Sequence, residues 1–302
     1  MPYISVGDGH KLYYELHGAT TGKPCVVLHG GPGGGCEQTV LKFFDLQRWR
    51  ILLFDQRGCG KSRPYGELRA NTTWHLVEDI EILRKTVMMT EQWTVFGGSW
   101  GSTLALAYAT RYPRCISAMI LRGIYLGESW ENDWMYTPWG AARMRPQEWQ
   151  AFEKGSGGKC RTTRSCLKNY RDRLLAKNRK TRKAAVRAWN AWESSLSRLE
   201  SQTSRESSWP LALLENHYFQ HNCWLKPGQL LHAAQKMTFP VHIIQGRWDL
   251  ICPPAAAFAL ADALPHATLI LTQAGHSAFD AATAKMLRRS TDSLMNNTAN
   301  FC

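Results

Sequence analysis

Short apolar runs alternate with helix-periodic segments through the first half of the chain, and this rhythm constrains the fold more than any other feature. The apolar runs are KPCVVLHG, WRILLFDQRG, QWTVFGGSWG and CISAMILRGI, and two intervening segments are NTTWHLVEDIEILRKTV and GSTLALAYATRYP. The first of these helices has Asn71, Thr72 or Thr73 as its N-cap candidate. Strands that alternate with helices form βαβ units, so we predict a mostly parallel, doubly wound α/β sheet.

The alternation stops near residue 128 and resumes near residue 236. Between these points the sequence indicates helices, and it contains the residues Trp130, Trp134, Trp139, Trp149, Trp189, Trp192, Trp209 and Trp224. Two further strand-like runs follow, MTFPVHIIQGRWD and ATLILTQAGHS, separated by the helix-former-rich AAAFALADAL. We therefore predict a sheet domain made of residues 1–128 and 236–302, interrupted by a helical cap at 129–235. The polar final segment TDSLMNNTANFC is expected to fray.

The net charge of +13 is concentrated in one part of the chain. Between Lys154 and Arg187 there are thirteen Lys and Arg residues and a single acid, Asp172. A solvated helical face is the simplest interpretation of such a stretch, and a docking patch for an acidic partner, a membrane surface or nucleic acid is the alternative. The stretch has no RNA-binding signature and no zinc module, so no nucleic-acid partner is expected.

The sequence predicts neither a membrane span nor a metal site. No apolar run approaches the roughly 18 residues that a transmembrane helix needs, and no signal peptide is evident at the N-terminus, so a cytoplasmic location is expected. Nine cysteines occur, without a CxxC pair or a Cys/His cluster at zinc spacing, which favours free thiols in a reducing compartment. They are Cys25, Cys36, Cys59, Cys115, Cys160, Cys166, Cys223, Cys252 and Cys302.

The segment Gly97-Gly98-Ser99-Trp100-Gly101 matches the pattern G-x-S-x-G. It follows the apolar run WTVF and precedes the helix-forming STLALAYA, which is the strand, tight turn and helix that a nucleophile elbow requires. Glycines flank such a serine because its backbone is strained and the strand and helix approach closely. Ser99 is therefore the predicted nucleophile, and the amides that begin the next helix point at the site where negative charge develops.

A serine hydroxyl needs a base to take its proton, and the base needs an acid to orient it. In this fold the partners follow the serine in the order acid, then histidine, each on a loop after a strand. Asp249 follows VHIIQGRW and His276 follows ATLILTQAG, so both order and placement match. His29, His217, His221 and His232 fit less well, and Asp55 in DQRG, which precedes the serine, is interpreted as structural.

The loop from His29 to Gly35, HGGPGGG, is too rich in glycine for an ordinary connection. It follows a strand at the place where hydrolases of this type supply the second oxyanion amide. A phosphate-binding loop is the rival interpretation, but the Lys-Ser/Thr ending of a P-loop is missing. The predicted oxyanion donors are the backbone N–H groups of Trp100 and of Gly31 or Gly30.

Taken together, HGGPGGG, DQRGCGKS, GGSWGS, RGIYLGESWENDW, WE, ENHYF, GRWDLICP and AGHS resemble the proline iminopeptidase (prolyl aminopeptidase) family of α/β-hydrolases. The resemblance runs from about Val6 to about Ala278 and is poor in the basic segment. It implies an enzyme with catalytic Ser99, Asp249 and His276 that removes N-terminal proline from short peptides with a free N-terminus. It also implies that Glu193 and Glu215 bind the substrate amine, and that Trp and Phe residues of the cap form the apolar slot for the pyrrolidine ring.

The expected mechanism passes through an acyl-enzyme and needs neither a metal nor an organic cofactor. A carboxylate in a closed, low-dielectric pocket suits a cationic amine, which gives the two glutamates an independent chemical rationale. Two alternatives stay open. One is an esterase, lactonase or biosynthetic amide hydrolase that uses the same three residues under a different cap, and the other is a binding protein that keeps the fold without turnover.

Overall fold

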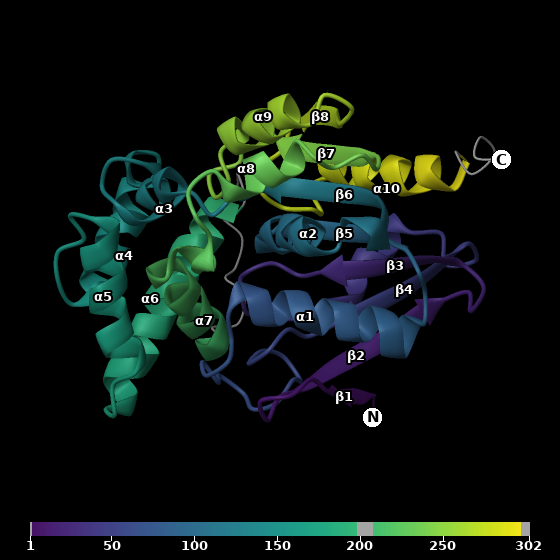
Figure 1. The fold of residues 1–302 in the computed structure, drawn as a ribbon. Helices are drawn as coiled ribbons and strands as arrows, with labels where there is room; N and C mark the ends of the chain where they lie inside the picture. The colour runs from purple at the N-terminus through teal and green to yellow at the C-terminus, as the bar shows by residue number, and fades with distance from the viewer. Residues whose placement is uncertain (1, 198–207, 297–302) are drawn as a thin grey trace.

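A computed structural model describes residues 2–197 and 208–296 and contains an eight-stranded sheet within them (Figure 1). The strands are β1 (Tyr3–Ser5), β2 (Lys11–Gly18), β3 (Lys23–Leu28), β4 (Trp49–Phe54), β5 (Trp93–Ser99), β6 (Ile116–Ile124), β7 (Val241–Gly246) and β8 (Thr268–Thr272). Their order is β1-β2-β4-β3-β5-β6-β7-β8. Strands β3 to β8 are mutually parallel and β1 and β2 are antiparallel at one edge, which confirms the predicted fold class.

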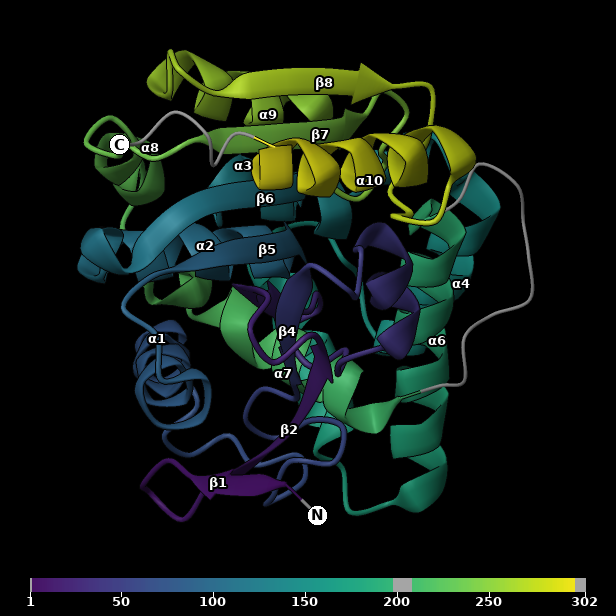
Figure 2. The same ribbon diagram turned by 90° about the vertical axis from the view of Figure 1, so that its right-hand side faces the viewer.

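Helices cover both faces of the sheet. Those of the described residues are α1 (Thr73–Leu83), α2 (Trp100–Arg111), α3 (Ser129–Tyr136), α4 (Pro146–Ser156), α5 (Thr163–Leu174), α6 (Arg179–Ser197), α7 (Trp209–Gln220), α8 (Gln229–Ala234), α9 (Pro254–Ala263) and α10 (Ala281–Asn296). Helices α1, α2, α8 and α9 lie on one face, and α10 with the 3₁₀ segment Gln38–Phe43 lies on the other (Figure 2). The chain is doubly wound, as the alternation of elements predicts.

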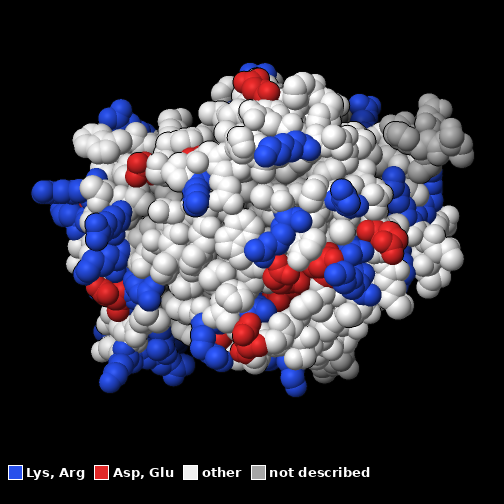
Figure 3. Space-filling model, in the orientation of Figure 1, with Lys and Arg blue, Asp and Glu red and all other residues white. Residues whose placement is uncertain are grey.

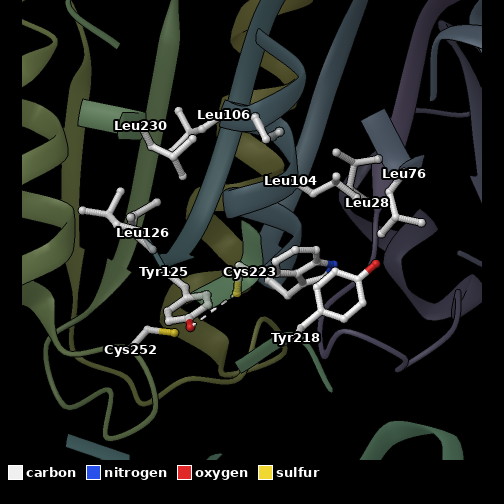
Figure 4. Close-up of a cluster of buried hydrophobic side chains, with 14 of the residues drawn as sticks. Leu28, Leu76, Leu104, Leu106, Tyr125, Leu126, Tyr218, Cys223, Leu230 and Cys252 are labelled. Atoms are coloured by element: carbon white, nitrogen blue, oxygen red, sulfur yellow. Dashed lines mark hydrogen bonds between the residues drawn. The ribbon is translucent and has the colours of Figure 1, made fainter. Parts of the chain in front are cut away.

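The central strands are apolar on both faces because each face is covered. Along β5, Val95 packs in the core beneath α2 while its neighbour Phe96 packs in the smaller core beneath α10. The alternation of side chains along a strand directs successive residues to these two cores. In Figure 4, Leu104 and Leu106 of α2 belong to the larger cluster, which extends to Tyr125 and Cys252. The central strands are therefore packed on both faces by buried side chains.

Local sequence signals set several helix ends. The Thr72 hydroxyl accepts a hydrogen bond from the backbone N–H of His75, so Thr72 is the N-cap of α1 among the three candidates. Helix α2 begins at Trp100, directly after Ser99, as the nucleophile-elbow pattern predicts. Helix α4 ends at Gly157, whose φ of +77° is costly for other residues.

Helices α3 to α8 occupy the sequence between β6 and β7. Helix α4 packs on α6, α5 packs on α7, and the short α8 lies against α2 and α9 of the sheet domain. Trp149, Trp189 and Trp192 are buried among these helices, whereas Trp130 and Trp139 are exposed. Most of the helical segment lies to one side of the sheet, beyond the carboxyl end of β5 (Figure 1).

The prediction that the final segment frays is wrong for its first half. Residues 291–296 continue α10, with Thr291 and Leu294 buried, while 297–302 lie outside the described residues. The Thr291 hydroxyl donates to the backbone carbonyl of Phe43, which makes a polar residue compatible with the buried face. None of the described helices combines the length and apolar character needed to cross a bilayer.

Candidate active site

Ser99 stands in the strained turn between β5 and α2. Its φ of 57° and ψ of −128° are unusual for a residue with a side chain and confirm the predicted strain. A Cβ atom at Gly97 would lie 2.3 Å from the carbonyl oxygen of Gly101, and one at Gly101 would lie 2.1 Å from that of Leu28. The outer glycines of the motif therefore let strand and helix backbones meet, as the sequence pattern indicates.

Asp249 and His276 come together from the loops after β7 and β8. The Nδ1 atom of His276 lies 2.8 Å from Oδ2 of Asp249. The other carboxylate oxygen of Asp249 accepts hydrogen bonds from the backbone N–H groups of Ile251 and Cys252, at 2.9 and 2.8 Å. Asp249 is only 3% exposed, so the orientation of its carboxylate is closely determined.

Ser99 and His276 line the same cavity, although within the described residues no hydrogen bond joins them. Among the described residues, Ser99 Oγ makes a long contact of hydrogen-bond type with Cys252 Sγ, at 4.0 Å. Contacts between nucleophile and base are often long before substrate binds and shorten in the reacting complex. The three residues nevertheless have the chain order and loop positions of a Ser-His-Asp site.

The glycine loop lies directly beside the serine. A Cβ atom at Gly30 would be 3.4 Å from the Cβ of Ser99. Gln56 links this loop to α2, because its backbone N–H donates to His29 Nε2, its side-chain amide donates to the His29 carbonyl, and its Oε1 accepts from the Trp100 indole. Trp100 is fully buried at the first position of α2. Both elements that carry the predicted oxyanion donors are therefore held against Ser99.

Asp55 has the structural role that was predicted for DQRG. Its carboxylate accepts hydrogen bonds from the backbone N–H groups of Cys36 and Lys61, each at 2.7 Å. Gly35 and Gly60 pack against the same carboxylate. Asp55 thus connects the end of the glycine loop to the segment after β4.

Glu193 of α6 and Glu215 of α7 line the cavity that also contains Ser99 and His276. The cavity has a volume of about 300 Å³. Tyr136 donates to Glu193 Oε1 at 3.1 Å, and the Trp189 indole donates to Glu215 Oε2 at 2.6 Å. Two carboxyl groups from neighbouring helices therefore meet at the wall of the cavity, 22 positions apart in sequence.

Burial raises the pKa of both carboxyl groups. Desolvation is the main cause for Glu193, whose pKa rises despite hydrogen bonds from Glu215 and Tyr136. For Glu215, desolvation is reinforced by the neighbouring Glu193, and its pKa lies well above the usual range. Both shifts favour the protonated forms, and a cation placed between the two groups would favour ionisation.

Aromatic residues line the cavity. Phe219 of the helical segment is among them, as predicted for a cap phenylalanine, whereas no tryptophan of the described residues lines the cavity, so that part of the prediction is wrong. The rings on the wall are Tyr136 and Phe219 from the helical segment, Tyr125 after β6, and Phe43, Phe96 and Phe279. The rings of Tyr136 and Trp189 stack with centroids 5.1 Å apart, so Trp189 lies behind the wall. Trp189 is therefore a core residue that packs behind Tyr136 and supports the cavity wall.

Three further residues shape the site without a sequence signal that singled them out. Gln245 of β7 donates to Asp249 Oδ2 and to the Cys252 carbonyl, and its Oε1 accepts from Ile124 N–H. Gly123 packs against the imidazole of His276. Arg122 lies beside the same imidazole. Position at the ends of β6 and β7 was the available clue, since site residues gather at the carboxyl edge of a parallel sheet.

The basic stretch is mostly exposed. Ten of its thirteen Lys and Arg residues are exposed, and within the described residues Lys159 pairs with Glu153 and Lys168 with Asp172. Lys180, Lys183 and Arg187 follow one another at helical spacing along the solvent side of α6. Lys and Arg side chains gather over the helical segment at the left of Figure 3. We call the surface formed by residues 154–187 the basic surface.

Eight cysteines lie in the described residues, and all are free thiols, as predicted; Cys302 lies outside them. Within residues 2–197 and 208–296, no group of three or more His, Cys, Asp or Glu side chains is arranged to hold a metal ion. Polar groups that line the cavity include Ser99, His276, the carboxyl pair, Glu37 and the side chains of Arg122, Asn132 and Asn190.

The fold and the arrangement of Ser99, His276 and Asp249 define a hydrolase of the α/β-hydrolase class. A family model described as alpha/beta hydrolase fold matches residues 23–283. An esterase from Exiguobacterium antarcticum has a similar structure, with a TM-score of 0.62 and 19% identity over 97% of this chain and 98% of the esterase.

Closer relatives specify the family. The chain is 42% identical to the proline iminopeptidase of Xylella fastidiosa (strain Temecula1), over 97% of this chain and 95% of the relative. It is also 42% identical to the probable proline iminopeptidase of Leptolyngbya boryana, over 98% of this chain and 94% of that protein. The chain belongs to the proline iminopeptidase family, which confirms the resemblance seen in its motifs.

Proposed function

We propose that the protein is a serine aminopeptidase that releases an N-terminal residue, preferentially proline, from short peptides. The observation that carries this proposal is one cavity lined by both Ser99 and His276 and by the carboxyl pair of Glu193 and Glu215. A nucleophile and a carboxyl pair in the same small cavity suit a substrate whose charged amine and scissile carbonyl belong to one residue. Family membership supports the same conclusion.

In the proposed reaction Ser99 attacks the carbonyl carbon of the N-terminal residue while His276 takes the hydroxyl proton. Asp249, which lies 2.8 Å from Nδ1, holds the imidazole in the required tautomer. The N–H groups of Trp100 and of Gly31 or Gly30 stabilise the oxyanion, each contributing on the order of 3 kcal/mol to lowering the barrier. His276 then protonates the leaving amine, and water releases the acyl-enzyme.

The carboxyl pair would recognise the free amine. Burial raises the pKa of both groups because it disfavours their charged forms, and an ammonium that pairs with them compensates for this loss of solvation. An acylated amine offers no such compensation and leaves buried polar groups unpaired, which costs about 1–3 kcal/mol for each group. The site would therefore reject blocked N-termini.

The aromatic wall supports a preference for proline. Tyr125, Tyr136 and Phe219 present rings to the cavity, with Tyr125 and Phe219 in edge-to-face contact at 5.8 Å. A pyrrolidine ring is compact and apolar, and it can pack on such rings while its nitrogen reaches the carboxyl pair. We also propose that residues 129–235 act as the cap that encloses this end of the cavity.

Two supporting proposals concern the surroundings of the enzyme. Free thiols at eight described cysteines favour a reducing compartment, so we propose a cytoplasmic location. The basic surface is proposed as a docking site for an acidic protein partner, because its exposed cations greatly outnumber the acids within it.

The assay that tests the function compares three chromogenic substrates: Pro-p-nitroanilide, N-acetyl-Pro-p-nitroanilide and p-nitrophenyl acetate. We expect turnover of Pro-p-nitroanilide and a kcat/KM for N-acetyl-Pro-p-nitroanilide that is lower by at least about a hundredfold. Hydrolysis of both amides should be lost in Ser99→Ala. Equal turnover of free and blocked amides would favour the esterase, lactonase or amide-hydrolase alternative. A folded protein whose Ser99 resists a fluorophosphonate probe would favour the binding-protein alternative.

A further inference from the structure

Arg122 crosses from the sheet to the loop that carries the proposed general base. It lies near the end of β6, directly opposite Gly98 of β5 in the strand register. Its Nη1 atom lies 3.0 Å from the backbone carbonyl oxygen of His276 and 3.3 Å from Nε2 of the same residue. The guanidinium is half-buried and also lines the cavity. One side chain therefore contacts both the backbone and the reactive nitrogen of His276.

The middle glycine of the nucleophile motif makes room for this side chain. A Cβ atom at Gly98 would lie 2.2 Å from Nε and 2.7 Å from Cζ of Arg122. Gly97 and Gly101 differ in this respect, because the atoms nearest to their Cβ positions belong to backbone. Gly98 also lacks a positive φ, so backbone conformation does not explain it. The space above Gly98 is occupied by the guanidinium.

We propose that Arg122 is a positioning residue that fixes the location of His276, and that Gly98 is glycine to admit its side chain. The guanidinium donates to the backbone carbonyl of His276 at 3.0 Å, while Asp249 Oδ2 lies 2.8 Å from Nδ1 of the ring. Hydrogen bonds from a charged donor are stronger than those between neutral groups. Arg122 and Asp249 therefore hold the backbone and the ring of His276. The contact of Arg122 with Nε2 is longer, at 3.3 Å, and it must open when Nε2 accepts the proton of Ser99.

This inference rests on the proposed role of His276 as general base, and it is tested without a peptide substrate. The rate at which a fluorophosphonate labels Ser99 is measured against pH in wild type, Arg122→Met and Arg122→Lys. Arg50→Met is the matched control, since Arg50 is also half-buried and donates to a backbone carbonyl, that of Met88. Circular dichroism establishes that each variant is folded.

We expect Arg122→Met to label about tenfold to hundredfold more slowly at its optimum, the range for losing a charge-assisted hydrogen bond. Arg122→Lys keeps a cationic donor, so it should retain more of the wild-type rate than Arg122→Met. Added guanidinium ion should restore part of the Arg122→Met rate. A wild-type rate in Arg122→Met, a loss that neither guanidinium ion nor the Arg122→Lys variant restores, or the same loss in Arg50→Met would overturn the proposal.

A second variant keeps the proposal testable if Arg122→Met does not fold. Gly98→Ala retains the charge of Arg122 but displaces the guanidinium, so labelling should slow as in Arg122→Met. Wild-type labelling at Gly98→Ala would overturn the pairing of the two residues. If wild type labels normally yet does not hydrolyse Pro-p-nitroanilide, the proposed aminopeptidase function fails while the role of Arg122 stands. Wild type that does not label at all overturns both.

Discussion

Gly123 lies directly against the imidazole of His276: a Cβ atom at Gly123 would be 3.0 Å from Cε1 and 3.2 Å from Nδ1. The same atom would be 3.4 Å from Asp249 Oδ2, so it would press on both members of the hydrogen-bonded pair. The residue has a φ of +52° at a point where the register between β5 and β6 shifts. A bulge that only glycine occupies readily therefore brings the imidazole and carboxylate together above the sheet.

We predict that Gly123→Ala lowers kcat for Pro-p-nitroanilide by about a hundredfold, the loss that accompanies displacement of a catalytic group by about 1 Å. Gly228→Ala is the control, because Gly228 also has a positive φ, +70°, but a Cβ there would meet nothing within 4 Å. It should show the cost of backbone strain in its melting temperature and leave kcat unchanged. Equal kcat values for the two variants would contradict the assigned role of Gly123.

Trp189→Phe should weaken binding of the substrate amine. The change removes the indole N–H that Glu215 Oε2 accepts at 2.6 Å, so the ionised form of that carboxyl loses a donor in a buried site. We expect KM for Pro-p-nitroanilide to rise about tenfold with a smaller change in kcat.

Trp192→Phe provides the comparison for that variant, because Trp192 is buried in the same helix but donates to the Met135 carbonyl. Its KM should stay near the wild-type value. A similar rise in KM for both variants would indicate loss of packing rather than loss of the hydrogen bond to Glu215.

Glu215→Gln should stabilise the protein increasingly as pH rises. Burial, reinforced by Glu193, raises the pKa of Glu215 above the ordinary glutamate value. When pH passes the ordinary value, the unfolded chain releases the proton while the folded chain retains it, so rising pH favours unfolding of wild type. The variant lacks this penalty, and its melting temperature relative to wild type should be higher at pH 9 than at pH 5, although its amine recognition is lost.

Glu153→Gln should show the opposite trend. Burial acts to raise the pKa of Glu153, but hydrogen bonds from the Cys160 backbone and from Lys159 outweigh it, and the pKa is lowered. The ionised carboxylate therefore contributes stability that is present above the ordinary glutamate pKa and is lost as pH falls through the lowered value. Two variants with the same trend in melting temperature would refute the assignment for Glu215.

Gln245→Leu should destabilise the protein by about 2–4 kcal/mol, because the Ile124 N–H and the Cys252 carbonyl would be buried without this partner. Urea denaturation measures the change in free energy of unfolding. Gln273→Leu is the control: Gln273 is exposed and accepts only from the Trp248 indole at the surface, so its effect should stay within about 0.5 kcal/mol.

Neutralising the basic surface should separate docking from catalysis. Six exposed residues are changed to Gln: Lys168, Lys177, Arg179, Lys180, Lys183 and Arg187. With poly-L-glutamate as the acidic probe, we expect weaker, less salt-dependent binding and unchanged turnover of Pro-p-nitroanilide. The control changes six exposed cations elsewhere: Lys42, Arg114, Lys226, Lys236, Lys285 and Arg289. Equal loss of binding in both variants would mean that net charge alone, rather than this surface, attracts the probe.

Local patterns were sufficient to predict the sheet and the positions of Ser99, Asp249 and His276 after its strands. The strand runs before Ser99, Asp249 and His276 are apolar on both faces, and turn residues follow each run, so order and placement could be read along the chain. Helix α10 escaped prediction because hydroxyl residues such as Thr291 occupy part of its buried face. These polar residues interrupt the apolar periodicity on which the prediction depends, and their hydrogen bonds to backbone make them compatible with burial.

The sequence by itself determined the class of fold, the nucleophile elbow and the family, because each depends on residues close together in the chain. Only the tertiary structure decided that Arg122 and Gly123 meet His276 and that Glu193 and Glu215 meet each other. These contacts depend on strand register and on how α6 and α7 pack, which no local pattern encodes. The same packing places Trp189, one of the cap tryptophans expected in the pocket, behind the pocket wall, where its indole donates a hydrogen bond to Glu215.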